Sequence, residues 1–122
     1  MKKEYRLVIA GCRSFNNYCK LACEVKKEIK KLKKSHTIII VSGGAKGADA
    51  LGERFARWHG MKVEKYLAKW DTYGRSAGPR RNEQMAQAAD AVIVFWDGQS
   101  KGTKSMIECA EKYRKPCRII EI

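Results

Sequence analysis

The chain alternates between short apolar runs and longer segments in which apolar residues recur at helical spacing. The run at 38–41 is β-branched throughout, and it is followed by a glycine-rich turn and then by a helical pattern. A run of this kind is typical of a strand that is buried on both faces of a parallel sheet. It is the first indication of an α/β fold.

The same reasoning divides the rest of the chain into elements. Apolar runs predict strands at 5–10, 37–41, 62–66, 91–96 and 117–120. Apolar residues at helical spacing predict helices at 17–35, 48–59, 79–89 and 103–113. Five strands separated by helices predict a three-layer α/β/α Rossmann-like sandwich with a five-stranded, mostly parallel sheet.

The domain organisation follows from length and composition. The 122 residues contain no linker, repeat or low-complexity tract, so we expect a single domain, 1–122. The segment 68–78 shows no element pattern and is expected to be an irregular, functional loop. No apolar run approaches the length of a membrane span, and no signal-peptide pattern follows the Met-Lys-Lys start. We therefore expect a cytoplasmic protein without a membrane partner.

The formal net charge of +13 raises the question of a nucleic-acid partner. The segment 20–34 alone contains seven lysines and two glutamates. Its apolar residues form one helical stripe, so we expect the lysines on the solvated face of a helix. The charge of this basic protein favours anionic ligands in general, and a nucleic-acid footprint is the less favoured interpretation.

The cysteines and histidines do not form a metal-binding pattern. The five cysteines include no Cys-x-x-Cys pair, and the two histidines, His36 and His59, lie far from any cysteine cluster. We expect reduced structural thiols, no metal site and no cofactor.

Residues with chemical character gather in four segments, at 11–15, 42–49, 70–82 and 96–103, each of which follows a predicted strand. Ligands of open α/β sheets bind beyond the carboxyl ends of the strands, where the strand order reverses. We therefore expect these segments to form one site.

Two of these segments are glycine-rich turns between a strand and a helix. The turn 43–47 is neither a Walker loop nor Gly-x-Gly-x-x-Gly, because its lysine precedes the last glycine and no Lys-Ser or Lys-Thr pair follows. Glycines let the backbone approach a ligand, and the next helix points its free N–H groups at the same place. Together with the turn 98–103, this pattern favours an anion with more than one charge. Tight packing is the alternative reason for each turn.

The segment 78–82 places two arginines at a predicted helix start, where a cation opposes the helix dipole. A bound phosphate would explain this placement, and simple exposure to solvent is the alternative. Trp70 and Tyr73 could stack on a base or pack against the core. Asp49 could cap its helix or bond a ribose hydroxyl, and Asp97 could cap, hold a ligand or act as a base.

Taken together, the motifs at 11–15, 41–49, 78–82 and 95–103 resemble the YspA-like, YpsA-related branch of the SLOG superfamily. This superfamily groups the Smf/DprA proteins with the Lonely Guy (LOG) phosphoribohydrolases. The resemblance covers about residues 5–120 and implies a Rossmann-like fold that binds a nucleotide or nucleotide-derived ligand. Members are proposed as sensors or processors of such ligands, and the Smf/DprA members bind single-stranded DNA.

The resemblance to the LOG enzymes is weaker at their catalytic motif. These enzymes cleave the N-glycosidic bond of nucleoside monophosphates with Pro-Gly-Gly-x-Gly-Thr-x-x-Glu, of which Gly102-Thr103 is matched here. Met106 holds the position of the glutamate, and Glu108 comes two residues later. On a helix this offset turns the side chain by about 200°, so we expect Glu108 off the ligand-facing side. If the protein is an enzyme, Asp97 and Asp49 are the candidate catalytic residues.

We therefore predict a protein that binds a nucleotide, nucleotide-sugar or related phosphorylated ligand at the carboxyl edge of the sheet, as a sensor. The alternatives are an N-glycosidic or phosphoribosyl hydrolase acting on nucleoside monophosphates, and a single-stranded nucleic-acid-binding module. The residues predicted to contact the ligand are Gly11, Arg13, Ser14, Ser42, Gly43, Gly44, Lys46, Gly47, Asp49, Trp70, Arg80, Arg81, Asn82, Asp97, Gly98, Ser100, Gly102 and Thr103. A homo-oligomer is also expected, since LOG-type relatives self-associate.

Overall fold

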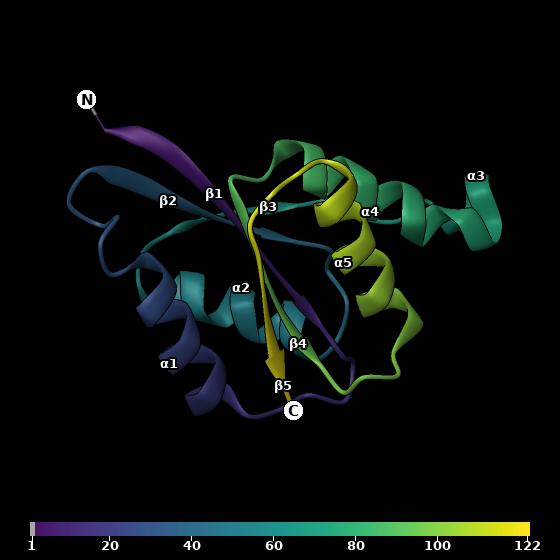
Figure 1. Ribbon diagram of the computed structural model, residues 1–122, viewed down its shortest axis with the longest axis horizontal. Helices are drawn as coiled ribbons and strands as arrows, with labels where there is room; N and C mark the ends of the chain where they lie inside the picture. The colour runs from purple at the N-terminus through teal and green to yellow at the C-terminus, as the bar shows by residue number, and fades with distance from the viewer. Residues whose placement is uncertain (1) are drawn as a thin grey trace.

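Five strands alternate with helices along residues 2–122, the part of the chain that the computed structural model describes (Figure 1). The strands are β1 (Lys3–Gly11), β2 (His36–Ser42), β3 (Lys62–Lys65), β4 (Ala91–Trp96) and β5 (Cys117–Glu121). The helices are α1 (Tyr18–Ile29), α2 (Ala48–Trp58), α3 (Trp70–Tyr73), the 3₁₀ turn η1 (Gly74–Ser76), α4 (Ala77–Ala88) and α5 (Lys101–Lys112). Every element predicted from the sequence is present.

The strands form one sheet in the order β3-β2-β1-β4-β5, and every neighbouring pair is parallel. The chain adds β2 and β3 on one side of β1 and then crosses back to place β4 on the other side. The strand order therefore reverses between β1 and β4, which is where open sheets of this kind bind ligands. The predicted α/β Rossmann-like fold is confirmed.

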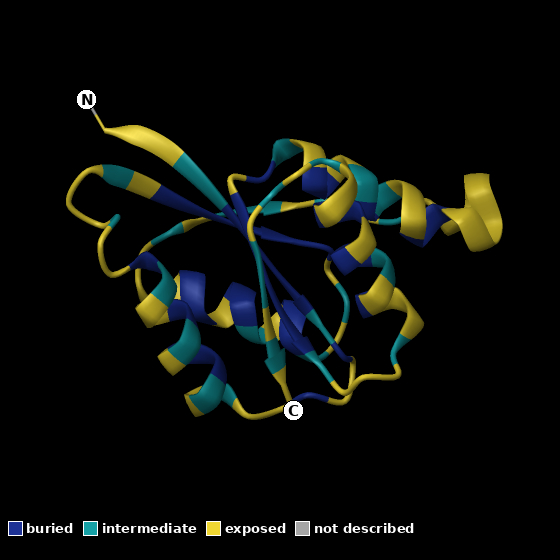
Figure 2. Ribbon diagram, in the orientation of Figure 1, coloured by how far each residue is buried: buried dark blue, intermediate teal, exposed yellow. Residues whose placement is uncertain are grey.

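Alternate residues of the strands face two separate hydrophobic cores, as the period of a strand requires. Leu7 and Ile9 of β1 pack with buried residues of α1 and α2, whereas Val8 and Ala10 pack with those of α4 and α5. The helix pairs accordingly lie on opposite faces of the sheet (Figure 1). Figure 2 shows the buried residues concentrated in the middle of the strands and on the inner sides of these helices.

Helix α1 is shorter than predicted. It begins after Asn17, whose side-chain Oδ1 accepts a hydrogen bond from the Lys20 N–H at 3.0 Å, and it ends at Ile29 rather than at residue 35. Residues 30–35 form turns instead, in which Leu32 N–H donates to the Ile29 carbonyl at 2.9 Å. Leu32 alone continues the apolar stripe, so little buried surface holds a longer helix while the chain reverses to enter β2.

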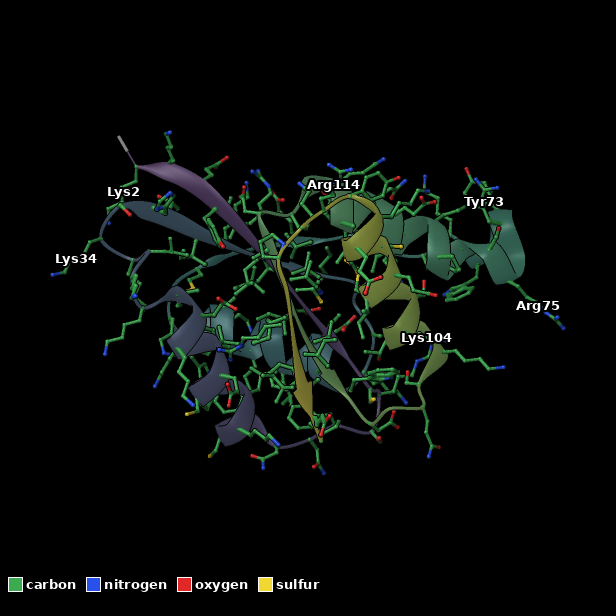
Figure 3. The ribbon with its side chains drawn as sticks, in the orientation of Figure 1. Lys2, Lys34, Tyr73, Arg75, Lys104 and Arg114 are labelled. Carbon is green, nitrogen blue, oxygen red and sulfur yellow. The ribbon has the colours of Figure 1, made fainter. Side chains whose placement is uncertain are left out.

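The predicted irregular loop at 68–78 is wrong. This segment contains α3 and η1, and α4 begins at Ala77, two residues before Pro79. The sequence pattern hid these turns because a four-residue helix shows no apolar period. They project from the body of the molecule and are exposed along their whole length (Figures 1 and 2). Figure 3 shows Tyr73 and Arg75 at the end of the molecule opposite Lys2 and Lys34.

Within residues 2–122, none of the helices has the length and apolar character needed to cross a bilayer. All five cysteines are free thiols, of which Cys12 and Cys109 are buried. The same residues contain no group of three or more His, Cys, Asp or Glu side chains that could hold a metal ion.

Candidate functional site

A cleft of about 460 Å³ opens at the carboxyl ends of β1 and β4, where the strand order reverses. Its walls come from the loop after β1, the start of α2, one side of α4 and the start of α5. The residues that line it are Ala10, Gly11, Cys12, Arg13, Ser14, Ala45, Asp49, Arg81, Asn82, Met85, Asp97, Ser100, Gly102, Thr103 and Met106. We call this the first cleft.

The loop after β1 is held in place by β4. The Cys12 N–H donates to the Phe95 carbonyl at 3.0 Å, and the Phe15 ring stacks on the Phe95 ring with centroids 5.0 Å apart. Arg13 and Ser14 lie between these two anchors and are exposed. Their side chains are therefore presented at the first cleft by a fixed backbone.

The glycine-rich turn between β2 and α2 bonds mostly to itself. The buried Ser42 hydroxyl donates to Glu53 at 2.7 Å and accepts from the Gly44 N–H at 3.1 Å. The Ala45 N–H donates to Asp49 Oδ2 at 3.3 Å. The N–H groups of Gly44 and Ala45 therefore bond to oxygens of the chain itself.

Gly47 must be glycine for two reasons. Its φ of 77° lies in the left-handed region, with ψ at −128°. A methyl group here would also collide with the Cys12 carbonyl and lie 2.6 Å from the Arg13 carbonyl oxygen. The turn thus packs directly on the loop after β1, which is a structural role that the sequence left open beside ligand contact.

Arg81 of α4 reaches across to this turn. Its Nη1 donates to the Gly43 carbonyl at 2.7 Å, and its Nε donates to Asn82 Oδ1 at 3.0 Å. A methyl group on Gly43 would lie 2.5 Å from Arg81 Nη1 and 2.9 Å from Asp49 Oδ2. Glycine at position 43 therefore allows the guanidinium and the carboxylate to pack against the same backbone.

Asn82 connects the two helices that flank the first cleft. It is buried, and its Nδ2 donates to Ser105 Oγ at 3.2 Å and to the Gly102 carbonyl at 3.4 Å. Since its Oδ1 holds Arg81, one amide fixes the arginine relative to the start of α5. Its predicted role in ligand contact therefore stands beside a clear structural role.

The start of α5 is capped by side chains and keeps N–H groups free. Asp97 Oδ1 accepts from the N–H groups of Gln99 and Ser100, each at 2.8 Å, and Ser100 Oγ accepts from the Thr103 N–H at 3.4 Å. No hydrogen bond within residues 2–122 uses the N–H of Lys101 or Gly102. These two groups lie at the positive end of the helix dipole, beside the first cleft.

The two aspartates of the first cleft have opposite electrostatic environments. Burial raises the pKa of Asp49 to about 6, and the Ala45 N–H and the charge of Arg81 only partly oppose the shift. The N–H groups of Ser100 and Gln99 lower the pKa of the exposed Asp97. Asp49 is therefore the carboxylate suited to proton exchange near neutral pH, whereas Asp97 stays ionised as a cap.

A second cleft of about 550 Å³ adjoins the first. Arg13, Ala45 and Arg81 line both clefts. The remaining walls of the second cleft come from the glycine-rich turn and from the chain that leads into α3. They are Gly43, Gly44, Lys46, Leu67, Ala68 and Trp70.

The structure brings most of the predicted ligand-contacting residues to these two clefts. Four of them line neither cleft in the part of the chain that the structure describes: Ser42, Gly47, Arg80 and Gly98. Arg80 instead points away from its neighbour Arg81. Its guanidinium lies 4.3 Å from the centre of the Tyr73 ring, and its Nε donates to Ser76 Oγ at 3.1 Å.

The first cleft also contains residues that were not among the predicted ligand contacts, although Cys12 lies in the predicted segment 11–15 and Met106 holds the position of the LOG glutamate. Cys12 accepts a hydrogen bond from the Asp97 N–H at 3.4 Å, and the apolar side chains of Met85 and Met106 line the wall. Apolar side chains carry no chemical signal in a sequence. The sequence predicts that Glu108 points away from the ligand-facing side of α5. The structure agrees, since Met106 lines the first cleft whereas Glu108 is exposed and lines neither cleft.

Comparison with known proteins identifies the family. The profile of the YspA, cpYpsA-related SLOG family matches residues 5–73, which run from β1 to α3. The chain belongs to this family. The resemblance seen in the sequence motifs is thereby confirmed. The family match includes the loop after β1 and the whole glycine-rich turn, whereas Arg81 and the start of α5 lie beyond it.

Individual relatives extend this picture. The Gene 61 protein of Mycobacterium phage D29 is 38% identical over 81 residues, which cover 62% of this SLOG chain and 65% of the phage protein. The match thus spans just under two thirds of that curated relative. DNA processing protein A (DprA) from Streptococcus pneumoniae has a TM-score of 0.71 at 22% identity, covering 96% of this chain and 50% of DprA. DprA from Helicobacter pylori has the same score and identity, covering 94% and 64%. The TM-score of 0.71 establishes a shared fold, and at 22% identity the similarity shows the fold alone.

Proposed function

We propose that this SLOG protein binds a nucleotide or nucleotide-derived phosphorylated ligand in the first cleft and acts as a sensor of it. The observation that carries the proposal is the meeting of Arg13, Arg81 and the free N–H groups of α5 at the point where the strand order reverses. Guanidinium groups and helix N-termini are the partners that phosphate oxygens prefer. Membership of the SLOG family supports the same class of ligand.

The electrostatics of Arg81 support an anionic ligand. Burial lowers the pKa of Arg81, and the charge of Asp49 only partly offsets this effect. The guanidinium remains charged, because arginine titrates far above neutral pH. A half-buried cation whose neighbouring carboxylate, Asp49, is partly protonated near pH 6 is stabilised by a bound phosphate, and the net charge of +13 attracts such a ligand.

One observation favours a hydrolase as the second candidate. Asp49 is a buried carboxylate with a pKa of about 6 in the wall of the cleft, which suits a general acid or base. Met106 stands where LOG enzymes carry their glutamate, so Asp49 would have to replace it. Incubation with nucleoside monophosphates, followed by chromatography for the released base, separates the two. No released base across the common nucleotides excludes the hydrolase.

Single-stranded nucleic acid is a third class of ligand, since DprA from Helicobacter pylori binds single-stranded DNA and shares the fold. We place it behind a small ligand because the lysines of α1 lie outside the clefts. An extended nucleic-acid footprint would bind oligonucleotides with an affinity that falls steeply with salt.

The direct test is isothermal titration calorimetry with nucleoside mono- and diphosphates of each common base. We expect at least one nucleotide to bind at 1:1 stoichiometry and to displace any bound oligonucleotide. If no nucleotide binds while oligonucleotides do, the small-ligand proposal is wrong. The predicted homo-oligomer is tested separately by light scattering of the same sample.

A further inference from the structure

The second cleft contains an aromatic side chain, which the lining of the first cleft lacks. Leu67 and Trp70 are large apolar side chains that are 65% and 51% exposed. Both line the second cleft, beside Lys46. A half-exposed aromatic ring in a cleft that also contains a cation suits a planar heterocycle.

Each of these two side chains lies close to a glycine. A methyl group on Gly44 would lie 2.6 Å from Leu67 Cδ2, and one on Gly78 would lie 3.2 Å from Trp70 Cη2. Each apolar side chain therefore packs closely over a position without a side chain, although much of its surface is open to solvent. The platform is formed before any ligand arrives, so little ordering cost opposes binding.

The junction between the clefts is cationic. Arg13 and Arg81 line both, and the two hydrogen bonds of Arg81 to Gly43 and Asn82 fix its position. The first cleft beyond this junction is rich in sugar-binding groups, with the carboxylates of Asp49 and Asp97 and the hydroxyls of Ser14 and Ser100. Carboxylates accept hydrogen bonds from sugar hydroxyls.

We propose, building on the nucleotide-binding function above, that the ligand is an extended nucleotide that occupies both clefts. Its base stacks on Trp70 in the second cleft, its diphosphate lies at Arg13 and Arg81, and a second sugar or nucleoside fills the first cleft. The ligand class is thus a nucleoside diphosphate joined to a sugar or nucleoside. A mononucleotide would leave one of the two clefts empty.

The test compares ligands that share a base and differ in length: AMP, ADP and ADP-ribose, GMP, GDP and GDP-mannose, and UMP, UDP and UDP-glucose. Calorimetry with the wild-type chain is expected to show about tenfold or more tighter binding of the sugar-linked member than of the monophosphate in at least one series. Equal affinity within every series overturns the extended ligand but leaves nucleotide binding intact. Absence of any binding overturns nucleotide binding itself.

Two tryptophan variants test the base platform. Trp70→Ala is expected to weaken the sugar-linked ligand about tenfold, and Trp70→Phe to restore most of the affinity, because a ring still stacks. Trp58→Ala is the matched control, since Trp58 is 63% exposed at the end of α2 and lines neither cleft. Circular dichroism checks the fold of each variant. Unchanged affinity in a folded Trp70→Ala variant overturns the platform, as does an equal loss in Trp58→Ala.

Discussion

The turns after β2 and β4 look alike in sequence and behave differently in the structure. Each combines glycines with an aspartate and precedes a helix. In the first, Asp49 is buried and its pKa rises to about 6, and the loop bonds to itself. In the second, Asp97 is exposed, its pKa falls, and the N–H groups of Lys101 and Gly102 stay free. The two aspartates therefore differ in pKa because one is buried and the other is exposed, although the residue type is the same.

The largest expected effect is a difference in folding stability between alanine variants at Gly47 in the first turn and Gly98 in the second. Gly47→Ala should lower the free energy of unfolding by about 3–5 kcal/mol, because the methyl group adds a collision with the Cys12 carbonyl to an unfavourable φ. Gly98→Ala should cost only about 1–2 kcal/mol, since Gly98 has a similar φ of 83° but open space around it. Urea denaturation of both variants measures the difference. Equal losses would contradict the packing role assigned to Gly47.

The aspartates should differ in how they link stability to pH. The raised pKa of Asp49 means that the folded state binds its proton more tightly than the unfolded state does, whose value is near 3.8. Its ionisation therefore costs stability as pH rises from about 4 to 6, by up to about 3 kcal/mol. Asp49→Asn removes this cost, so the variant should gain stability relative to wild type between pH 4 and pH 7.

Asp97→Asn is the matched control for that experiment. The lowered pKa of Asp97 means that its contribution is present above about pH 4 and is lost only below that value, as pH falls through the folded-state pKa. The difference between this variant and wild type should therefore stay nearly constant from pH 4 to pH 7. Denaturation curves at both pH values decide it. A pH dependence shared by both variants would refute the contrast between the turns.

A smaller effect is expected where α4 meets the second turn. Asn82→Ala removes the buried amide that joins Arg81 to the Gly102 carbonyl and Ser105, and should cost about 1–3 kcal/mol of stability. Because Arg81 loses its support, nucleotide affinity should also fall. Thermal unfolding and calorimetry measure the two effects. Unchanged affinity would show that Arg81 is positioned without Asn82.

The two turns also show how far sequence reasoning reaches. The β-branched runs and helical stripes predicted the sheet and its helices, because burial on a regular element leaves a regular pattern. The sequence also placed both glycine turns at one edge. The sequence did not predict α3, because a four-residue helix is too short to show an apolar period. It also did not predict that the Gly44 and Ala45 N–H groups bond to Ser42 and Asp49, because these bonds depend on the orientation of the two side chains.

The two neighbouring arginines of α4 also show what the sequence alone cannot predict. Arg80 and Arg81 are indistinguishable in the sequence motif, but consecutive residues on a helix point about 100° apart. One therefore packs on Tyr73 in the projecting segment, and the other lines both clefts. Which of the two faces the site depends on the rotation of α4 against the sheet, and only the folded structure supplies it.

This pair provides the most direct test of the proposed site. Arg81→Ala and Arg80→Ala remove the same charge from neighbouring positions, so any general electrostatic effect is matched. Calorimetry with the tightest-binding nucleotide should show at least about a tenfold loss of affinity for Arg81→Ala, and less than about a twofold change for Arg80→Ala. Unchanged affinity in a folded Arg81→Ala variant, or equal losses in both, would contradict a nucleotide site at the junction of the two clefts.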